Sequence, residues 1–374
     1  MMIALSASMG CNDWRVMSRG LPFLHSIKPP LTGRIKSVPA DFVVEEIPAY
    51  LPSGEGEHLF LFVEKTDVAA EALLKHVARR LDISHRDIGC AGMKDRRAVT
   101  RQWLSVPTAC ADRVAAIETD QIRVLESRRH GNKLRTGHLK GNRFSILVRD
   151  VQGLEHTPTA EPQASIACGS AIRQAEHIRC RGFPNYYGEQ RFGHDGETLA
   201  LGFDLLARRT SPRDIPYDRR RFLLKLALSA AQAELFNRAL AERIADGIAE
   251  TVLSGDVMEV VASGGKFVAE DPAIEQPRYD AYETAVTGPM FGSKMRQPVG
   301  IPAERERRLL EAEGLQLLGL TGFGDLLSGT RRAYLVRPGD LAVKEEPDGL
   351  RFDFTLPPGA YATMLLREIV SIEV

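Results

Sequence analysis

The chain has 374 residues, with 49 Lys and Arg against 49 Asp and Glu, and 44% of its residues are hydrophobic. This length predicts two domains, and the ordinary composition excludes collagen-like, coiled-coil and disordered chains as descriptions of the whole protein. The five cysteines form no CxxC pair, which argues against a disulfide scaffold or a structural zinc site. No stretch is apolar enough to span a membrane, and the start of the chain lacks the features of a signal peptide. We therefore expect a cytoplasmic protein without a membrane anchor.

The first part of the chain predicts strands around one helix. Residues 41–47 and 57–64 are rich in β-branched and aromatic residues and predict two strands. Asp67 is then expected to cap a helix with one apolar face. That face consists of Leu73, Leu74, Val77 and Leu81. With further strands at 102–106 and 143–149, this order predicts an α+β fold with a mainly antiparallel sheet flanked by helices.

The pattern changes from about Cys180 onward. The expected elements are a loop at 182–188, helices at 220–244 and 303–313, strands at 332–337 and 350–356, and a last helix at 359–370. We infer a helix-rich α+β module that is inserted into a sheet domain. The sheet domain is completed by the C-terminal residues, and the first 30 residues are expected to form a loosely ordered extension.

The charges are unevenly spread along the chain. Residues 121–149 contain eight Lys and Arg against one acid, and residues 205–225 contain seven against two. Residues 241–283 reverse this balance, with ten acids and three bases. Such segregation can produce a basic surface that contacts phosphates. The alternative is a set of solvated faces whose charges interleave in the folded chain.

Several common site templates are absent from the sequence. No GxGxxG, GxxxxGK[ST] or HExxH pattern occurs, and the histidines have no metal-ligand spacing. We therefore expect no metal site, no dinucleotide-binding fingerprint and no phosphate-binding loop of these kinds.

One segment, Gly89–Trp103, has the composition of a reactive loop. Its glycines bend the chain around Asp95, which Lys94, Arg96 and Arg97 flank. Nearby cations favour an ionised carboxylate, and a positioned carboxylate can act as a nucleophile or a base. The alternative is a surface aspartate in a turn with ordinary ion pairs.

Two other segments carry groups that suit RNA. In residues 132–144, basic residues alternate with Gly and Asn before Phe144, and a displaced base needs an aromatic ring and an amide to contact. A core role is the alternative for Phe144. Residues 184–193 gather three aromatic residues and several polar side chains in one loop, which could also be purely architectural.

The chain resembles the tRNA pseudouridine synthase D (TruD) family in these three segments. The matching stretches are residues 91–103, Leu139-Lys-Gly-Asn-Arg-Phe144 and Gly182-Phe-Pro-Asn-Tyr-Tyr-Gly-Glu-Gln-Arg-Phe-Gly193. Residues 36–44 and 358–369 are also similar. The resemblance runs from about Leu31 to the C-terminus in one order.

The resemblance implies an enzyme that isomerises uridine to pseudouridine in tRNA, typically at position 13 in the D arm, without a cofactor. It implies a pseudouridine synthase domain at 31–181 and 333–374, with the family's insertion domain at 182–332. Its catalytic aspartate falls on Asp95 and its base-stacking aromatic on Phe144. The expected substrate-binding residues are Lys36, Lys94, Asn142, Phe144 and Arg191. Lys36 is also expected to pair with Asp95, and the chain is expected to act as a monomer.

Two other functions use the same segments. An RNA-binding protein or RNA chaperone without catalysis would need the basic and aromatic residues but would have no use for Asp95. A general hydrolase could use Asp95, but no His or second carboxylate accompanies it in the motif.

Overall fold

The computed structural model describes residues 20–24, 31–153, 163–193, 196–316 and 320–373. Its internal contacts divide the chain into two units. The sheet unit comprises Lys28–Cys180, Arg337–Ala362 and Leu366–Val374, and the helix-rich unit comprises Met1–Ile27, Arg181–Val336 and Thr363–Leu365. The expected N-terminal extension falls mostly outside the described residues. The expected division into a catalytic domain and an insertion domain stays a prediction.

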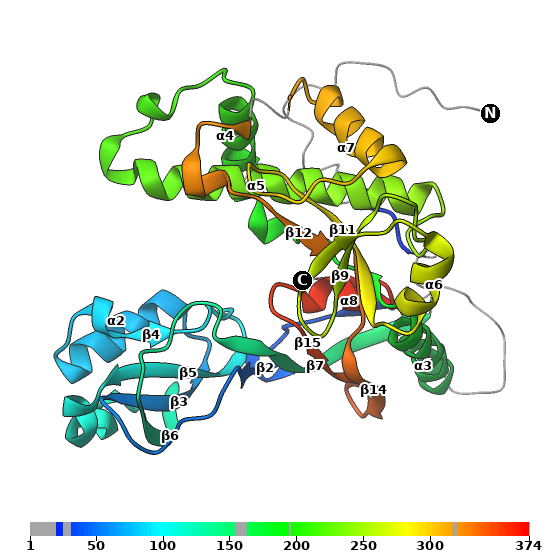
Figure 1. The fold of residues 1–374 in the computed structure, drawn as a ribbon. Coiled ribbons are helices and arrows are strands. Elements are labelled where there is room, and N and C mark those ends of the chain that lie inside the picture. The colour runs from blue at the N-terminus through cyan, green and yellow to red at the C-terminus, as the bar shows by residue number, and fades with distance from the viewer. Residues whose placement is uncertain (1–19, 25–30, 154–162, 194–195, 317–319, 374) are drawn as a thin grey trace. The chain divides into compact units, whose positions relative to one another are not determined.

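The sheet unit holds most of the strands labelled in Figure 1. Its strands are β1 (Leu31–Arg34), β2 (Phe42–Pro48), β3 (His58–Thr66), β4 (Gly89–Cys90), β5 (Val99–Pro107), β6 (Ile122–His130), β7 (Leu139–Gly153), β14 (Gly339–Glu346), β15 (Gly349–Leu356) and β16 (Val370–Glu373). Its helices are α2 (Ala70–Leu81) and α3 (Gln163–Arg181), and the last residue of α3 falls in the helix-rich unit. The short helix α8 (Ala362–Leu366) is shared, because its middle residues, Thr363–Leu365, belong to the helix-rich unit.

These strands form one sheet in the order β14-β15-β7-β2-β5-β3-β6, with β1, β4 and β16 joined to its members. The recorded pairs are antiparallel except β2 with β5 and β1 with β16, which are parallel. The predicted α+β fold with a mainly antiparallel sheet is thereby confirmed.

The face of β3 that alternates through Leu59, Leu61 and Val63 is buried together with helix α2. Helix α2 contributes its predicted apolar stripe, Leu73, Leu74, Val77 and Leu81, to the same cluster. The period-2 pattern of the strand and the 3.6-residue pattern of the helix therefore meet in one core.

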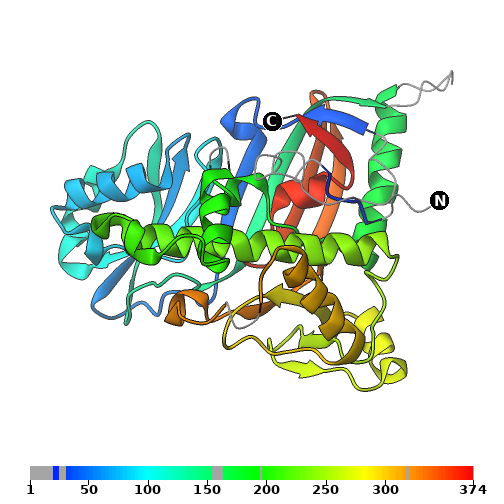
Figure 2. The ribbon, with the colours of Figure 1, turned by 90° about the horizontal axis from the view of Figure 1, so that it is seen from above.

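The helix-rich unit combines long helices with a small antiparallel sheet. Its helices are α4 (Glu197–Leu206), α5 (Tyr217–Ala245), α6 (Pro272–Asp280) and α7 (Gly300–Ala312). Its strands are β8 (Phe183–Pro184), β9 (Val257–Val260), β10 (Lys266–Val268), β11 (Thr284–Met290), β12 (Thr330–Ala333) and β13 (Leu335–Val336). The four strands β10-β9-β11-β12 form one sheet, and β8 pairs with β13. Figure 2 shows α5 along its length.

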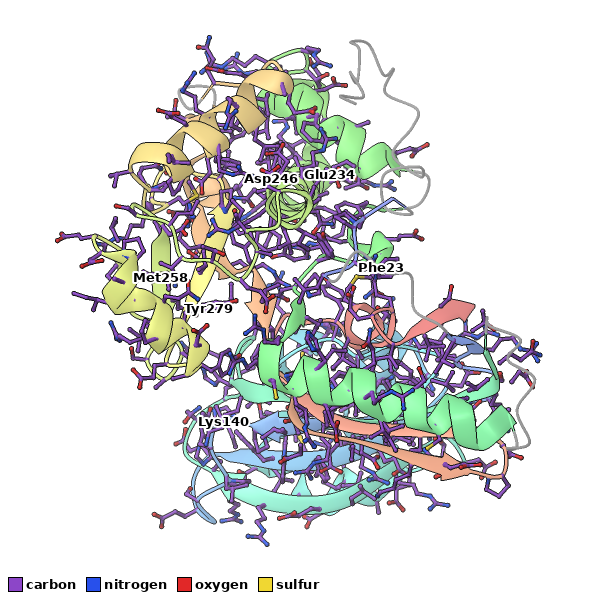
Figure 3. The ribbon with its side chains drawn as sticks, turned by 90° about the vertical axis from the view of Figure 1, so that its right-hand side faces the viewer. Phe23, Lys140, Glu234, Asp246, Met258 and Tyr279 are labelled. Atoms are coloured by element: carbon purple, nitrogen blue, oxygen red, sulfur yellow. The ribbon has the colours of Figure 1, made fainter. Side chains whose placement is uncertain are left out.

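The core of this unit follows from α5. Leu228, Ala231 and Leu235 on α5 pack with Leu309 and Leu310 of α7 in one cluster. A second cluster joins the later turns of α5 to the small sheet. Its members include Phe236, Leu240, Met258, Tyr279 and Val286, of which Met258 and Tyr279 are labelled in Figure 3. Among the described residues, no helix is long and apolar enough to cross a membrane.

Three local expectations were wrong. Asp67 does not cap α2: the residue before the helix is Ala69, and Asp67 has a left-handed backbone, with its N–H donating to the Ala98 carbonyl. The strand expected at 332–337 is two strands, β12 and β13, because the first pairs with β11 and the second with β8. The last helix, α8, ends at Leu366, because the following residues form β16 against β1.

Candidate active site

Asp95 lies in the loop that joins β4 to β5, and its side chain is 41% exposed. Its Oδ2 atom is 2.9 Å from Lys36 Nζ, so the predicted ion pair is present. Within the part of the chain that the structure describes, the second carboxylate oxygen has no hydrogen-bond partner. The loop therefore presents an accessible carboxylate whose charge one ammonium group stabilises.

Lys36 reaches this position from a strained backbone just after β1. Its φ is 58°, in the left-handed region that residues other than glycine seldom adopt. Its Nζ atom also lies 4.3 Å from the centroid of the Phe42 ring at the start of β2. Such strain persists only where surrounding contacts hold it and is common at functional sites. Here the held group is the partner of Asp95.

Lys65, at the end of β3, is a site residue that the sequence analysis missed. It pairs with Thr100 across β3 and β5, is 0% exposed, and donates from Nζ to the Asp95 carbonyl at 2.6 Å. Burial lowers the pKa of Lys65 to about 8, and the negative charge of Asp95 opposes that shift. Lys65 thus holds the main chain of Asp95 from the buried side of β3, while Lys36 contacts the side chain of Asp95.

Lys94 points into the unit instead of into solvent. Its Nζ atom is 2.8 Å from Glu46 Oε2, and the side chains are 6% and 0% exposed. Glu46 also accepts from the Trp103 N–H at 3.4 Å through its other oxygen. This buried pair ties the Asp95 loop to β2 and β5, and Glu46 is a second residue that the sequence analysis missed. The expected contact of Lys94 with substrate stays a prediction.

Phe144 belongs to a group of three aromatic rings. Its ring stacks on Phe354 of β15, with centroids 5.3 Å apart, and meets Phe42 edge-on at 6.2 Å. It is 7% exposed, and it lies directly opposite Phe354 in the sheet. Because Lys36 contacts Phe42, these rings lie beside the Asp95 ion pair. Neither Phe42 nor Phe354 was singled out from the sequence.

Asn142 lies two residues before Phe144 and shares its face of β7. In the sheet it is directly opposite Glu46, the partner of Lys94. Its Oδ1 atom is buried and has no hydrogen-bond partner among the described residues. A buried amide without a partner is unusual in a native fold, so this atom is a candidate to receive a substrate donor.

Arg191, the remaining expected site residue, belongs to the helix-rich unit. It lies in a short 3-10 helix, Glu189–Arg191, and its guanidinium carbon is 5.6 Å from the Tyr187 ring centroid. Its Nε atom is buried and has no partner among the described residues. The structure thus brings together Lys36, Asp95, Asn142 and Phe144 within the sheet unit, and Arg191 is described in its own unit.

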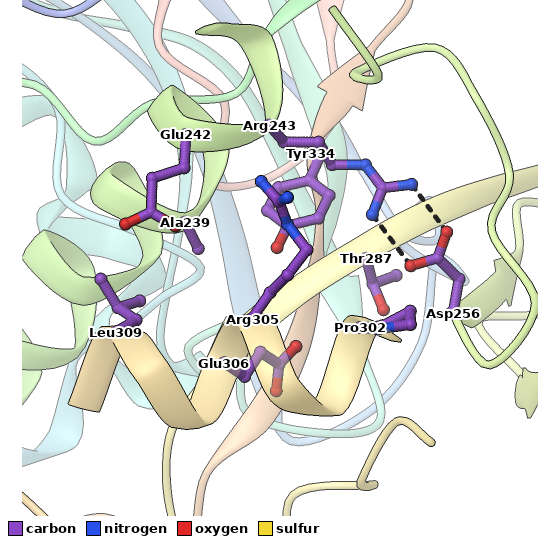
Figure 4. Close-up of a pocket in the computed structure, with 10 residues that line it drawn as sticks. All are labelled: Ala239, Glu242, Arg243, Asp256, Thr287, Pro302, Arg305, Glu306, Leu309 and Tyr334. Atoms are coloured by element: carbon purple, nitrogen blue, oxygen red, sulfur yellow. Dashed lines mark hydrogen bonds and ion pairs between the residues drawn. The ribbon is translucent and has the colours of Figure 1, made fainter. Parts of the chain in front are cut away.

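A small cavity in the helix-rich unit also has a charged lining (Figure 4). Arg243 is paired there with Asp256 at 2.6 Å, and Glu306 is paired with Arg331 at 2.8 Å. Burial raises the pKa of Glu306 to about 7, and the charge of Arg331 opposes this shift. The cavity of about 20 Å³ has room for roughly one water molecule. We therefore assign these paired charges to the architecture of the unit.

Across the described ranges, no three His, Cys, Asp or Glu side chains are grouped as metal ligands. The expectation of a reaction without metal or cofactor stays a prediction.

Comparisons with known proteins place this chain in a family. The model for the family "tRNA pseudouridine synthase D (TruD)" matches residues 20–211 and 220–369. The chain belongs to this family. The matched residues include the Asp95 loop, the Phe144 strand and the Arg191 helix.

Curated relatives are similar in sequence to this chain over most of their length. A tRNA pseudouridine synthase D of Anaeromyxobacter dehalogenans is 44% identical over 353 residues, which cover 94% of this chain and 97% of the relative. A tRNA pseudouridine synthase D of Thermus thermophilus is 41% identical over 354 residues, covering 94% and 92%.

A solved structure shares the fold. The crystal structure of a Methanosarcina mazei protein, described as a tRNA pseudouridine synthase D, superposes with a TM-score of 0.69. The match covers 91% of this chain and 94% of that one at 22% identity. At this identity the match supports the architecture alone.

Proposed function

We propose that this chain isomerises uridine to pseudouridine in tRNA and that Asp95 is its essential carboxylate. Membership of the TruD family supports the reaction class. The observation that carries the residue assignment is the partly exposed Asp95 side chain, paired with Lys36 and held at its main chain by buried Lys65. A purely RNA-binding protein would not need a carboxylate fixed in this way.

The reaction detaches the uracil ring from its ribose, rotates it and rejoins it through carbon. The target nucleotide must first leave its stack, which costs a few kcal/mol. A carboxylate can then attack the sugar carbon, attack the pyrimidine ring or remove a sugar proton. Each of these routes needs a carboxylate that the nucleotide can reach, and the partly exposed Asp95 side chain beside the Lys36 ammonium supports this role.

The neighbouring residues fit the remaining tasks. Phe144, with Phe354 behind it, provides an aromatic platform for the detached ring. The unpartnered oxygen of Asn142 would accept a hydrogen bond from the base edge. Lys36 holds the charge of Asp95, and Lys94 holds the loop through Glu46. Arg191 would contact the RNA from its own unit.

The finer parts of the proposal concern the target nucleotide, which follows the family resemblance, and the cellular location and oligomeric state. The target is uridine 13 in the D arm of tRNA, and the enzyme acts in the cytoplasm as a monomer.

The test is release of tritium from tRNA that carries the label at C5 of uridine. Forming the new carbon–carbon bond expels this hydrogen, so wild type should release it and Asp95→Asn should not. The variant should keep its affinity for tRNA, because it removes no phosphate contact. Asp87→Asn makes the same change at an exposed residue of the same unit and should behave as wild type.

Two results would contradict the proposal. Turnover by Asp95→Asn would show that Asp95 is not the essential carboxylate. Tight tRNA binding by wild type without any tritium release would favour the RNA chaperone.

A further inference from the structure

The first three turns of α5 present an unusual combination of residues to solvent. Tyr217 and Phe222 are 87% and 69% exposed, and Arg221 and Lys225 are exposed beside them. Tyr217, Arg221 and Lys225 are four residues apart and therefore form one row, which Phe222 adjoins. We call these four residues the α5 outer face.

The α5 outer face is not needed for packing within its own unit. The buried face of the same turns carries Leu224, Ala227 and Leu228, which belong to the core of the helix-rich unit. Large aromatic residues are normally buried to a great extent. Two exposed rings on one helix surface therefore indicate a surface for binding.

The cations of this face are available to a partner. Over the described ranges, neither Arg221 nor Lys225 makes an ion pair, whereas Arg219 pairs with Asp218 at 3.7 Å. The guanidinium of Arg220 lies 5.5 Å from the Tyr217 ring centroid and donates to the Ile215 carbonyl, which steadies the ring. The basic run seen in the sequence is thus only partly neutralised in the fold.

We propose that the α5 outer face is an RNA-docking surface that stacks on unpaired nucleotides of tRNA. Arg221 and Lys225 would contact phosphates, and Tyr217 and Phe222 would stack on bases. Single-stranded loops are the parts of RNA whose bases are free to stack on aromatic side chains beside basic ones. An acidic protein partner could also bury the two rings, but protein interfaces are depleted in lysine, whereas this face carries Lys225 in its row.

The inference rests on the proposed function only for the identity of the RNA. Its test uses the full chain and measures the dissociation constant for tRNA over a range of salt concentrations. One variant is Tyr217→Ala/Phe222→Ala, which removes the rings and no charge. The other is Arg221→Ala/Lys225→Ala, which removes two cations and no ring.

The two variants should fail differently. Loss of a ring should weaken binding roughly 5- to 160-fold for each base that loses its stacking partner, with the salt slope unchanged. Loss of the cations should reduce the slope of log K against log salt by about 1.4, since each phosphate contact on a single strand contributes about 0.7.

Matched controls are available in the same unit. Lys294→Ala/Arg307→Ala also removes one Lys and one Arg, both exposed and paired with Asp325 and Glu311. Ile274→Ala/Ile301→Ala removes two exposed apolar side chains. Both controls should bind as wild type, and thermal unfolding should show that all variants are folded.

A wild-type dissociation constant for the ring variant, or a wild-type salt slope for the charge variant, would overturn the proposal. Those results would leave tritium release by wild type intact. Conversely, a wild type that binds tRNA through this face but releases no tritium would remove the proposed function and retain the docking surface.

Discussion

The substitution Lys65→Met tests whether Lys65 contributes to the stability of the fold or to the position of Asp95. Burial lowers the pKa of Lys65 from 10.5 to about 8, so its ammonium group at pH 7 costs about 3 kcal/mol relative to water. Its hydrogen bond to the Asp95 carbonyl returns about 1.5–3 kcal/mol. Methionine fills a similar volume without the charge. The free energy of unfolding at pH 7 should therefore stay within about 2 kcal/mol of wild type.

Catalysis should respond differently from stability. Without Lys65, the main chain of Asp95 loses its contact from β3, and a small displacement of a reacting group lowers rate steeply. We expect single-turnover tritium release to fall at least tenfold, with tRNA affinity unchanged. Lys65→Arg keeps the cation and should recover part of the rate.

The pH dependence of stability gives a second measurement. Between pH 8 and 10.5 the unfolded state binds more protons at Lys65 than the folded state does, so this group makes stability rise with pH there. Below pH 8 both states are protonated and the cost is constant. The stability of wild type relative to Lys65→Met should thus improve between about pH 8 and 10.5.

Urea unfolding followed by tryptophan fluorescence provides the assay for wild type and variant at pH 7 and pH 10. Other titrating groups cancel in the difference between the two proteins. A variant several kcal/mol less stable at pH 7 would show that the ammonium is net stabilising and would refute the reasoning. So would a stability difference that is the same at both pH values.

The remaining predictions concern one ring and two buried ion pairs. Phe144→Leu should remain folded but lose at least tenfold in single-turnover rate, because it fills the core without offering a ring; an unaltered rate would return Phe144 to a purely structural role. Glu46→Gln leaves buried Lys94 uncompensated and should lower the free energy of unfolding by about 3–5 kcal/mol in urea. Arg243→Met leaves Asp256 unpaired and should cost a similar amount; a loss under 1 kcal/mol would contradict the assignment of that pair to the architecture.

Local patterns were sufficient where an element buries one face. The stripe of α2 was visible because its apolar residues recur with the helical period and meet the core. The strand β3 was visible from its β-branched and aromatic residues. Local patterns gave a wrong prediction at the C-terminus. Val370 and its neighbours form β16 because β1, from the other end of the chain, pairs with them. Long-range pairing of this kind is not encoded in any short window of sequence.

The candidate site was predictable where its residues belong to recognisable motifs and was missed where they belong to ordinary strands. Asp95, Asn142 and Phe144 stand in motifs, whereas Lys65 and Glu46 stand in strands that read as ordinary. Lys65 nevertheless continues the alternation of Leu59, Leu61 and Val63, and that phase placed it on the buried face. Because residues 59–63 are apolar without a break, the sequence does not show which face Lys65 occupies, and its partner became visible only through the pairing of β3 with β5.

This position shows why the site departs from the pattern around it. Selection for stability alone would favour an apolar side chain at residue 65, because its strand neighbours on the same face are Leu and Val. The chain instead keeps an ammonium group that costs about 3 kcal/mol at pH 7. The contact that this group makes is with the carbonyl of Asp95. Lys65 thus departs from the apolar pattern of its strand where it contacts the candidate catalytic residue. We infer that the chain accepts a lower stability at this residue in return for a fixed position of Asp95.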